Sequence, residues 1–222
     1  MSWESTVVYY RAVNELVKQK LGGLRSAKIA MVSVDFEPLE QLQHAGEWGQ
    51  VADILVAGAR SIEAAGADLL VICTNTMHKV APQIEESVNI PLLHIADATA
   101  AVVKEGGIDT VGLLGTGFTM EQGFYKGRLI DKHGLGVLTP ESTDRDIVHR
   151  TIYEELCRGS IREEAKQEFL RIVDDLAGKG AEAVILGCTE IGLLIKQCDT
   201  QVKLIDTTTV HAQRAVEMAL NE

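Results

Sequence analysis

Short apolar runs alternate with longer amphipathic segments along the whole chain. The runs are rich in Val, Ile and Leu, a composition typical of buried parallel strands. They span Lys28–Ser33, Asp68–Cys73, Pro91–Ile95, Asp109–Gly115, Leu135–Leu138, Ala183–Gly187 and Lys203–Ile205. Apolar residues at helical spacing predict helices over Trp48–Ala65, Arg145–Arg158 and Ile161–Gly178. The alternation predicts an α/β fold with mainly parallel sheets flanked by helices.

Two segments of the chain are similar enough to suggest an internal duplication. Gly66–Thr76 and Gly180–Glu190 align without a gap, and each is an apolar run that ends in small, polar and thiol residues. The alignment places Thr74 opposite Cys188. Because ligands of α/β sheets bind outside the carboxyl ends of the strands, we expect these two side chains to face one ligand.

The duplication extends to Pro91–Val102 and Val202–Val216, in which a short strand is followed by an Asp and a helix. Asp97 and Asp206 are predicted to cap those helices. The repeat predicts two pseudo-symmetric α/β domains. The first would comprise residues 1–98 with 207–222 and the second residues 99–206, with the active site in the cleft between them.

A third match concerns the beginning of the chain. Asp109–Tyr125 pairs with Met1–Tyr9, but the first copy has no strand before Met1. The first strand of a doubly wound sheet usually lies in its interior, so its loss would remove hydrogen-bond partners from both neighbours. We therefore expect the natural protein to begin upstream, with an apolar strand that ends in glycine.

Composition narrows the class of ligand. The chain has 222 residues, 46% of them hydrophobic, and a formal net charge of -11. This negative charge, without a cluster of Lys or Arg, argues against nucleic acid and anionic membrane surfaces as partners. No apolar run approaches the roughly 20 residues of a membrane-spanning helix. The absence of a C-x-x-C pair and of a signal peptide favours reduced thiols, a cytoplasmic location and a small-molecule ligand.

Three motifs resemble those of the aspartate/glutamate racemase family, in the order that the family shows. They are Met1-Ser2-Trp3-Glu4-Ser5, Thr74-Asn75-Thr76-Met77-His78 and Gly187-Cys188-Thr189-Glu190. The resemblance covers essentially the whole chain and is strongest to the bacterial racemases specific for L-aspartate and L-glutamate. It implies a cofactor-independent homodimer that racemises L-aspartate or L-glutamate, or a broader range of amino acids.

The family normally places one cysteine on each side of the substrate's α-carbon, whereas this chain has Thr74 at the first position. We assign Cys188 as the proton acceptor, because a strand-to-helix turn aims backbone N–H groups and the helix dipole at the sulfur, which would lower its pKa. Thr74, a poor base, would supply a proton from the opposite side. Cys73 is one residue early and is expected to face away. Turnover should therefore be faster from the L-enantiomer.

Binding of the substrate is assigned to polar residues near these two groups. The predicted binding residues are Met1, Ser2, Gln43, Asn75, Thr76, Thr189 and Glu190. The hydroxyl and amide groups of Asn75, Thr76 and Thr189 suit the carboxylate and ammonium of an amino acid, or each of these residues is a local cap. The resemblance implies that backbone N–H groups at Met1 and Ser2 reach the substrate. Glu190 either orients the ammonium or begins a helix, and Gln43 either reaches the substrate's side chain or is exposed on a helix.

Metal and dinucleotide sites are not expected. His78, His94 and His211 lack the close spacing of zinc ligands, and the loop Gly115-Thr116-Gly117 lacks the third glycine of a dinucleotide-binding loop. Two other classes of function stay open. Hydantoin racemases, maleate isomerases and arylmalonate decarboxylases use the same architecture, and a chain that has lost its first cysteine could bind an amino acid without racemising it.

Overall fold

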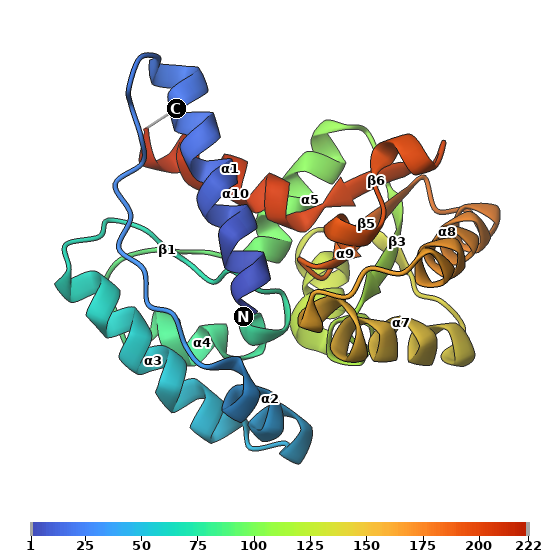
Figure 1. The fold of residues 1–222 in the computed structure, drawn as a ribbon, viewed down its shortest axis with the longest axis horizontal. Coiled ribbons are helices and arrows are strands. Elements are labelled where there is room, and N and C mark those ends of the chain that lie inside the picture. Colours follow the sequence, from blue (N-terminus) through green and yellow to red (C-terminus); the bar gives the residue numbers. More distant parts are fainter. Residues whose placement is uncertain (1, 221–222) are drawn as a thin grey trace.

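The structure, a computed structural model, describes residues 2–220 and contains two parallel sheets (Figure 1). The smaller sheet pairs β1 (Leu70–Val71) with β2 (Leu92–Leu93), and the larger one has the strand order β4-β3-β5-β6. The strands of the larger sheet are β3 (Thr110–Gly115), β4 (Gly136–Leu138), β5 (Ala183–Gly187) and β6 (Lys203–Asp206). The predicted α/β fold with parallel sheets and flanking helices is confirmed.

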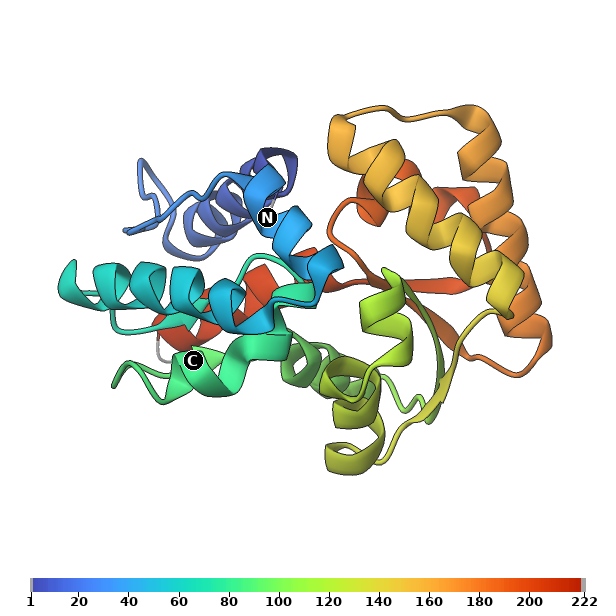
Figure 2. The ribbon, with the colours of Figure 1, turned by 90° about the horizontal axis from the view of Figure 1, so that it is seen from below.

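Helices cover both sheets. The α-helices are α1 (Trp3–Leu21), α2 (Phe36–Ala45), α3 (Trp48–Ala64), α4 (Ala81–Glu85), α5 (Ile95–Glu105), α6 (Gly117–Glu121), α7 (Ser142–Glu154), α8 (Glu163–Gly178), α9 (Ile191–Leu194) and α10 (Thr207–Ala219). The other helical segments are η1 (Thr76–Val80), η2 (Gly123–Lys132), η3 (Leu156–Arg158) and η4 (Gln197–Asp199). Figure 2 shows the larger sheet between α7 and α8 on one face and α5 and η2 on the other.

Several local signals act as the sequence predicts. Gly66 and Gly180 follow the ends of α3 and α8 with φ of 83° and 102°, in the left-handed region that favours glycine. The Asp206 carboxylate caps α10 by accepting a hydrogen bond from the N–H of Thr208 at 2.9 Å. The corresponding prediction for Asp97 is wrong. His94 caps α5 instead, and Asp97 pairs with the Arg128 guanidinium at 2.7 Å.

Strands β3 and β5 end side by side, with Gly115 opposite Gly187. A Cβ atom on Gly115 would lie 2.8 Å from the Gly187 carbonyl oxygen, and one on Gly187 would lie 2.7 Å from the Leu114 carbonyl oxygen. Only glycine permits this approach of the two backbones. The residues that follow, Thr116 and Cys188, therefore begin adjacent turns at the carboxyl edge of the larger sheet.

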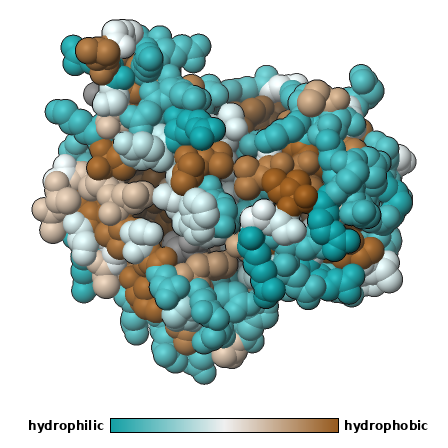
Figure 3. Space-filling model, in the orientation of Figure 1, coloured by the Kyte–Doolittle hydropathy of each residue, from teal (hydrophilic) through white to brown (hydrophobic). Residues whose placement is uncertain are grey.

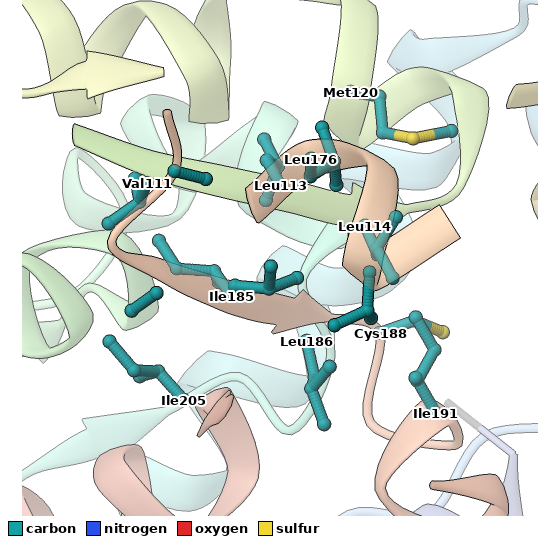
Figure 4. Packing of buried hydrophobic residues seen from close by; sticks show 14 of the residues in the cluster. Val111, Leu113, Leu114, Met120, Leu176, Ile185, Leu186, Cys188, Ile191 and Ile205 are labelled. Atoms are coloured by element: carbon teal, nitrogen blue, oxygen red, sulfur yellow. The ribbon is translucent and has the colours of Figure 1, made fainter. Parts of the chain in front are cut away.

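Each sheet has its own hydrophobic cluster. Around the larger sheet, Leu113, Leu114 and Ile185 are fully buried and pack as Figure 4 shows. Leu39 and Met77 belong to the second cluster, near the smaller sheet. Burial of such a side chain stabilises the fold by roughly 1.5–3 kcal/mol. These clusters hold the two sheets as separate packing units, and the division into two domains stays a prediction.

The predicted strand over Lys28–Ser33 is wrong, because this segment has no regular secondary structure. A strand needs a hydrogen-bonded neighbour, and none of the strands within residues 2–220 pairs with this segment. Its apolar side chains therefore stay exposed, with Met31 57% accessible. Figure 3 shows hydrophobic residues gathered on the side of the molecule that holds β1 and α3, while hydrophilic residues cover most of the opposite side.

Three buried histidines, from η1, the start of α5 and α10, lie together. The ring centroids of His78 and His94 are 4.4 Å apart, and those of His78 and His211 are 6.0 Å apart. The hydroxyl of Tyr9 lies 2.8 Å from His211 Nδ1. Burial lowers the pKa of all three histidines, to about 3 for His94 and about 4 for His211. All three are therefore neutral at neutral pH.

Acid should destabilise the protein through these histidines. The folded state favours the neutral imidazole, so the stabilisation is complete above the unfolded pKa of about 6.5 and is lost as the pH falls toward the folded pKa. For His211, whose folded pKa is about 4, the free energy of unfolding should drop by about 2 kcal/mol between about pH 7 and about pH 5. Urea unfolding measures this slope. H211Q should reduce it, and an unchanged slope in H211Q would contradict the assignment.

Candidate active site

The turn after β5 carries Cys188, Thr189 and Glu190. Cys188 is 8% exposed and Glu190 only 2%. The Cys188 thiol donates a hydrogen bond to Glu190 Oε2 at 2.9 Å, and the Thr189 hydroxyl donates to the same oxygen at 2.8 Å. Figure 4 shows the Cys188 side chain just beyond the end of β5, next to Ile191. A thiol and a carboxylate are thus paired at the carboxyl edge of the larger sheet.

Ser2 brings the start of α1 to this pair. Its hydroxyl donates to Glu190 Oε1 at 2.6 Å and, as the cap of α1, accepts from the N–H of Ser5 at 3.2 Å. Ser2 is 3% exposed. The hydrogen bond joins residues 188 positions apart in the sequence. Both oxygens of Glu190 are therefore occupied by donors, and the predicted binding residue Met1 lies outside the described residues.

The electrostatics of the pair differ from the prediction for Cys188. Burial and the adjacent Glu190 carboxylate raise the pKa of the Cys188 thiol well above its usual value. Burial alone would raise the pKa of Glu190 as well, but the hydrogen bonds from Cys188, Ser2 and Thr189 act against it and the pKa of this carboxyl is lowered. The resting pair is a thiol and an ionised carboxylate. The backbone N–H of Glu190 does lower the pKa of Cys188, but burial of the sulfur and the neighbouring carboxylate outweigh it, so the predicted lowering is wrong.

The turn after β1 carries Thr74, Asn75 and Thr76. The N–H of Thr74 donates to the carbonyl of Ile72 at 2.8 Å, and the Thr74 carbonyl lies 2.8 Å from His78 Nδ1. His78 Nε2 accepts from the N–H of Ile95 at 3.1 Å, so Nδ1 is the nitrogen that donates to Thr74. Thr74 is half-buried, while Asn75 and Thr76 are buried.

Hydrogen bonds link this turn to the larger sheet. The Thr76 and Thr116 hydroxyls are 3.0 Å apart, and Thr116 follows β3. The Asn75 side-chain amide donates to the Thr207 hydroxyl at 3.1 Å, which in turn donates to the carbonyl of Leu186 on β5 at 2.8 Å. The structure thus brings Asn75 and Thr76 to the edge of the sheet where the Cys188 turn begins.

Gln43 has a partner that the sequence does not indicate. The Tyr153 hydroxyl, on α7, donates to Gln43 Oε1 at 3.3 Å, and Gln43 itself is 2% exposed. The alternative of an exposed helix position is therefore wrong. A cavity of about 510 Å³ lies at this junction, lined in part by His44, His149 and Arg150. Tyr153 escapes sequence analysis because a lone aromatic at helical spacing is typical of core packing.

The other cysteines do not form a second reactive site or a metal site within the described residues. Burial raises the pKa of Cys73 to about 11, and Cys73, Cys157 and Cys198 are free. Among residues 2–220, no three His, Cys, Asp or Glu side chains are placed to hold a metal ion. None of the helices in this range is long and apolar enough to cross a bilayer.

The fold and site define a class of protein. A parallel α/β sheet presents a buried thiol–carboxylate pair at its carboxyl edge. Thr207 joins the strand before this pair to a Thr-Asn-Thr turn by hydrogen bonds. Such a pair can move protons at a bound small molecule. The sequence model of the Asp/Glu/Hydantoin racemase family matches residues 1–215. The chain belongs to this family of racemases, and the predicted resemblance is confirmed.

Solved structures and curated proteins include similar chains. The crystal structure of a putative Asp/Glu racemase from Yersinia pestis is 54% identical, covers 99% of this chain and 96% of its own, and has a TM-score of 0.91. An aspartate racemase homologue from Pyrococcus horikoshii is 34% identical, with coverages of 98% and 94% and a TM-score of 0.83. The broad specificity amino-acid racemase RacX of Bacillus subtilis is 19% identical over 75% of this chain and 71% of its own length.

Proposed function

We propose that the protein is a cofactor-independent amino-acid racemase that acts on L-aspartate and L-glutamate or on a broader range of L-amino acids. It would remove the Cα proton and return a proton to the opposite side of the same carbon. The observation that carries the proposal is the hydrogen bond of 2.9 Å between the Cys188 thiol and the ionised Glu190 carboxylate. Family membership and the similar aspartate racemase homologue support it.

Glu190 is the group to which Cys188 can pass its proton. Transfer of the thiol proton to Glu190 Oε2 leaves a thiolate, which is the nucleophilic and basic form of cysteine. The raised pKa of Cys188 makes that thiolate a strong base once it forms. The thiolate then takes the Cα proton, and the carbanion receives a proton from the Thr74 side. Solvent replaces the proton that leaves Thr74. Glu190 releases to solvent the proton that it took from Cys188, so both groups return to their starting state.

Asn75 supplies an acceptor for the substrate. Its Oδ1 atom is buried and has no hydrogen-bond partner, although the residue is only 2% exposed. A buried acceptor without a donor costs stability, and the ammonium of an amino acid would supply the missing donor. Thr76 and Thr189 keep their proposed binding roles at the two turns, and Gln43 would contact the substrate's side chain from the Tyr153 junction. A homodimer is proposed with them, on the resemblance.

Replacing Thr74 with cysteine should make the two directions of the reaction more alike. A threonine hydroxyl is a poor base at neutral pH, so the wild-type enzyme should abstract the Cα proton of a D-amino acid slowly. A thiol ionises more readily, and we expect T74C to raise kcat from the D-enantiomer by roughly tenfold or more. Initial rates from each enantiomer measure this change. Unchanged D-substrate turnover in T74C would contradict the role of Thr74. T209C, which changes an exposed threonine outside the candidate site, is the control.

Chiral chromatography tests the proposed activity itself. Purified protein is incubated with L-aspartate, L-glutamate and a panel of neutral and basic L-amino acids, without added pyridoxal phosphate. Appearance of the D-enantiomer identifies a racemase and its substrate range. If no member of the panel yields a D-enantiomer, the activity is not amino-acid racemisation, and binding of the same panel by calorimetry separates a non-catalytic binding protein from a related isomerase or decarboxylase.

A further inference from the structure

Thr207 connects the two turns of the candidate site. It is the first residue of α10 and is fully buried. Its hydroxyl oxygen lies 3.1 Å from Asn75 Nδ2 and 2.8 Å from the carbonyl oxygen of Leu186. Leu186 is on β5, two residues before Cys188. One hydroxyl therefore contacts both the turn that carries Thr74 and the strand that carries Cys188.

We propose that Thr207 is a positioning residue that fixes the orientation of the Asn75 side-chain amide. The threonine hydroxyl has one proton, and a carbonyl oxygen such as that of Leu186 can only accept. The proton is therefore committed to Leu186, and the Thr207 oxygen can only accept from its other neighbour. Asn75 must present its NH2 group to Thr207. Its Oδ1 atom is consequently held on the other side, where it is buried without a partner.

The orientation of the amide selects the substituent on the substrate's α-carbon. This inference rests on the proposed racemase function and adds the rule by which the site recognises its substrate. With Oδ1 facing the ligand, Asn75 accepts from an ammonium group. With the amide reversed, the NH2 group would face the ammonium, and two donors would oppose each other. A 2-hydroxy acid tolerates both orientations, because a hydroxyl can donate or accept.

Substitution of Thr207 separates these cases. T207V keeps the branched shape, but valine can neither accept a hydrogen bond from Asn75 nor donate one to Leu186. The amide of Asn75 is then free to reverse. T207S keeps the hydroxyl. We expect T207V to lower kcat/KM for the L-amino acid by about tenfold to a hundredfold, the range of a hydrogen bond to a charged group. T207S should stay within about threefold of the wild type.

A 2-hydroxy acid supplies the readout that a general loss of structure would not produce. The inhibition constant of the 2-hydroxy analogue of the best substrate, L-malate for L-aspartate, should change by less than about threefold in T207V. T209V is the matched control, because Thr209 is exposed and its hydroxyl donates to Asp206 at 3.2 Å, away from Asn75 and Leu186. It should leave both constants unchanged.

A second substitution tests whether Thr207 acts through Asn75. Aspartate at position 75 offers an acceptor in either orientation. The double variant N75D/T207V should therefore have nearly the same kcat/KM as N75D alone. Circular dichroism verifies folding of each variant, and T207A answers the same question if T207V does not fold.

The positioning role of Thr207 is overturned if T207V weakens kcat/KM for the amino acid and binding of the hydroxy acid by the same factor. It is also overturned if T207S does not behave as the wild type, or if the losses of T207V and N75D add fully. A wild-type protein that racemises no amino acid would instead overturn the proposed function, because the Thr207 comparison presupposes that activity.

Discussion

Replacing Cys188 with alanine should lower the rate of racemisation by about a thousandfold or more. The substitution removes the thiol proposed to accept the Cα proton, and a positioned acid or base contributes about 10²–10⁴ in rate. The fold should survive, since the β-carbon remains and the side chain lies at the end of β5 rather than in the middle of the sheet. Initial rates by chiral chromatography, with circular dichroism as a check of folding, measure the effect.

Cys198 supplies the matched control for this substitution. It is exposed and lies in η4, outside the candidate site. C198A should keep wild-type activity, so a loss confined to C188A is chemical rather than a general consequence of removing a thiol. Activity within about tenfold of the wild type in a folded C188A would show that another group accepts the proton.

Replacing Glu190 with glutamine should reduce kcat by about a hundredfold or more at neutral pH. The amide keeps the shape of the side chain but removes the acceptor of the thiol proton, and it leaves one of the three donors around the carboxylate without a partner. Because the carboxylate raises the pKa of Cys188, its removal should lower the pKa of that thiol. Activity of E190Q should therefore recover as the pH rises and the thiol ionises directly.

The pH dependence distinguishes this role of Glu190 from a structural one. A merely misfolded or loosened site would be slow at every pH, whereas E190Q should gain activity on the alkaline side. Glu182 is the control carboxylate. It accepts from the N–H groups of Asp109 and Thr110 at 3.0 and 2.9 Å, at the opposite edge of the sheet from Cys188. E182Q should retain the wild-type profile, and an E190Q profile parallel to it would contradict the proton-accepting role.

Short-range features of the fold follow from the sequence. The apolar runs that become β3 and β5 are continuous and bounded by glycine, which is why their prediction succeeds. The segment Lys28–Ser33 is also apolar and forms no strand, because a strand depends on a partner that local composition does not reveal. Asp97 fails as a cap for a similar reason. Arg128, which binds it, lies 31 residues away in the sequence.

Long-range contacts also limit what the sequence reveals about the candidate site. The motif after β5 identifies Cys188 and Glu190, yet it does not show that their side chains touch each other or that Ser2 binds the same carboxylate. Those contacts depend on how the chain closes over long distances. Thr207 and Tyr153 carry no motif at all. Each becomes visible only through a single hydrogen bond to Asn75 or Gln43, both of which the sequence does indicate.

Exchange of the Cα proton in D2O is the most direct test of proton transfer by the Cys188–Glu190 pair. Proton NMR would follow L-aspartate, L-glutamate and the same panel of L-amino acids with wild-type protein and with C188A. The thiol–carboxylate pair predicts loss of the Cα signal from at least one substrate, together with D-product, in the wild type and retention of the signal in C188A. Retention of the Cα signal for every amino acid with the wild-type protein would contradict racemisation by this site.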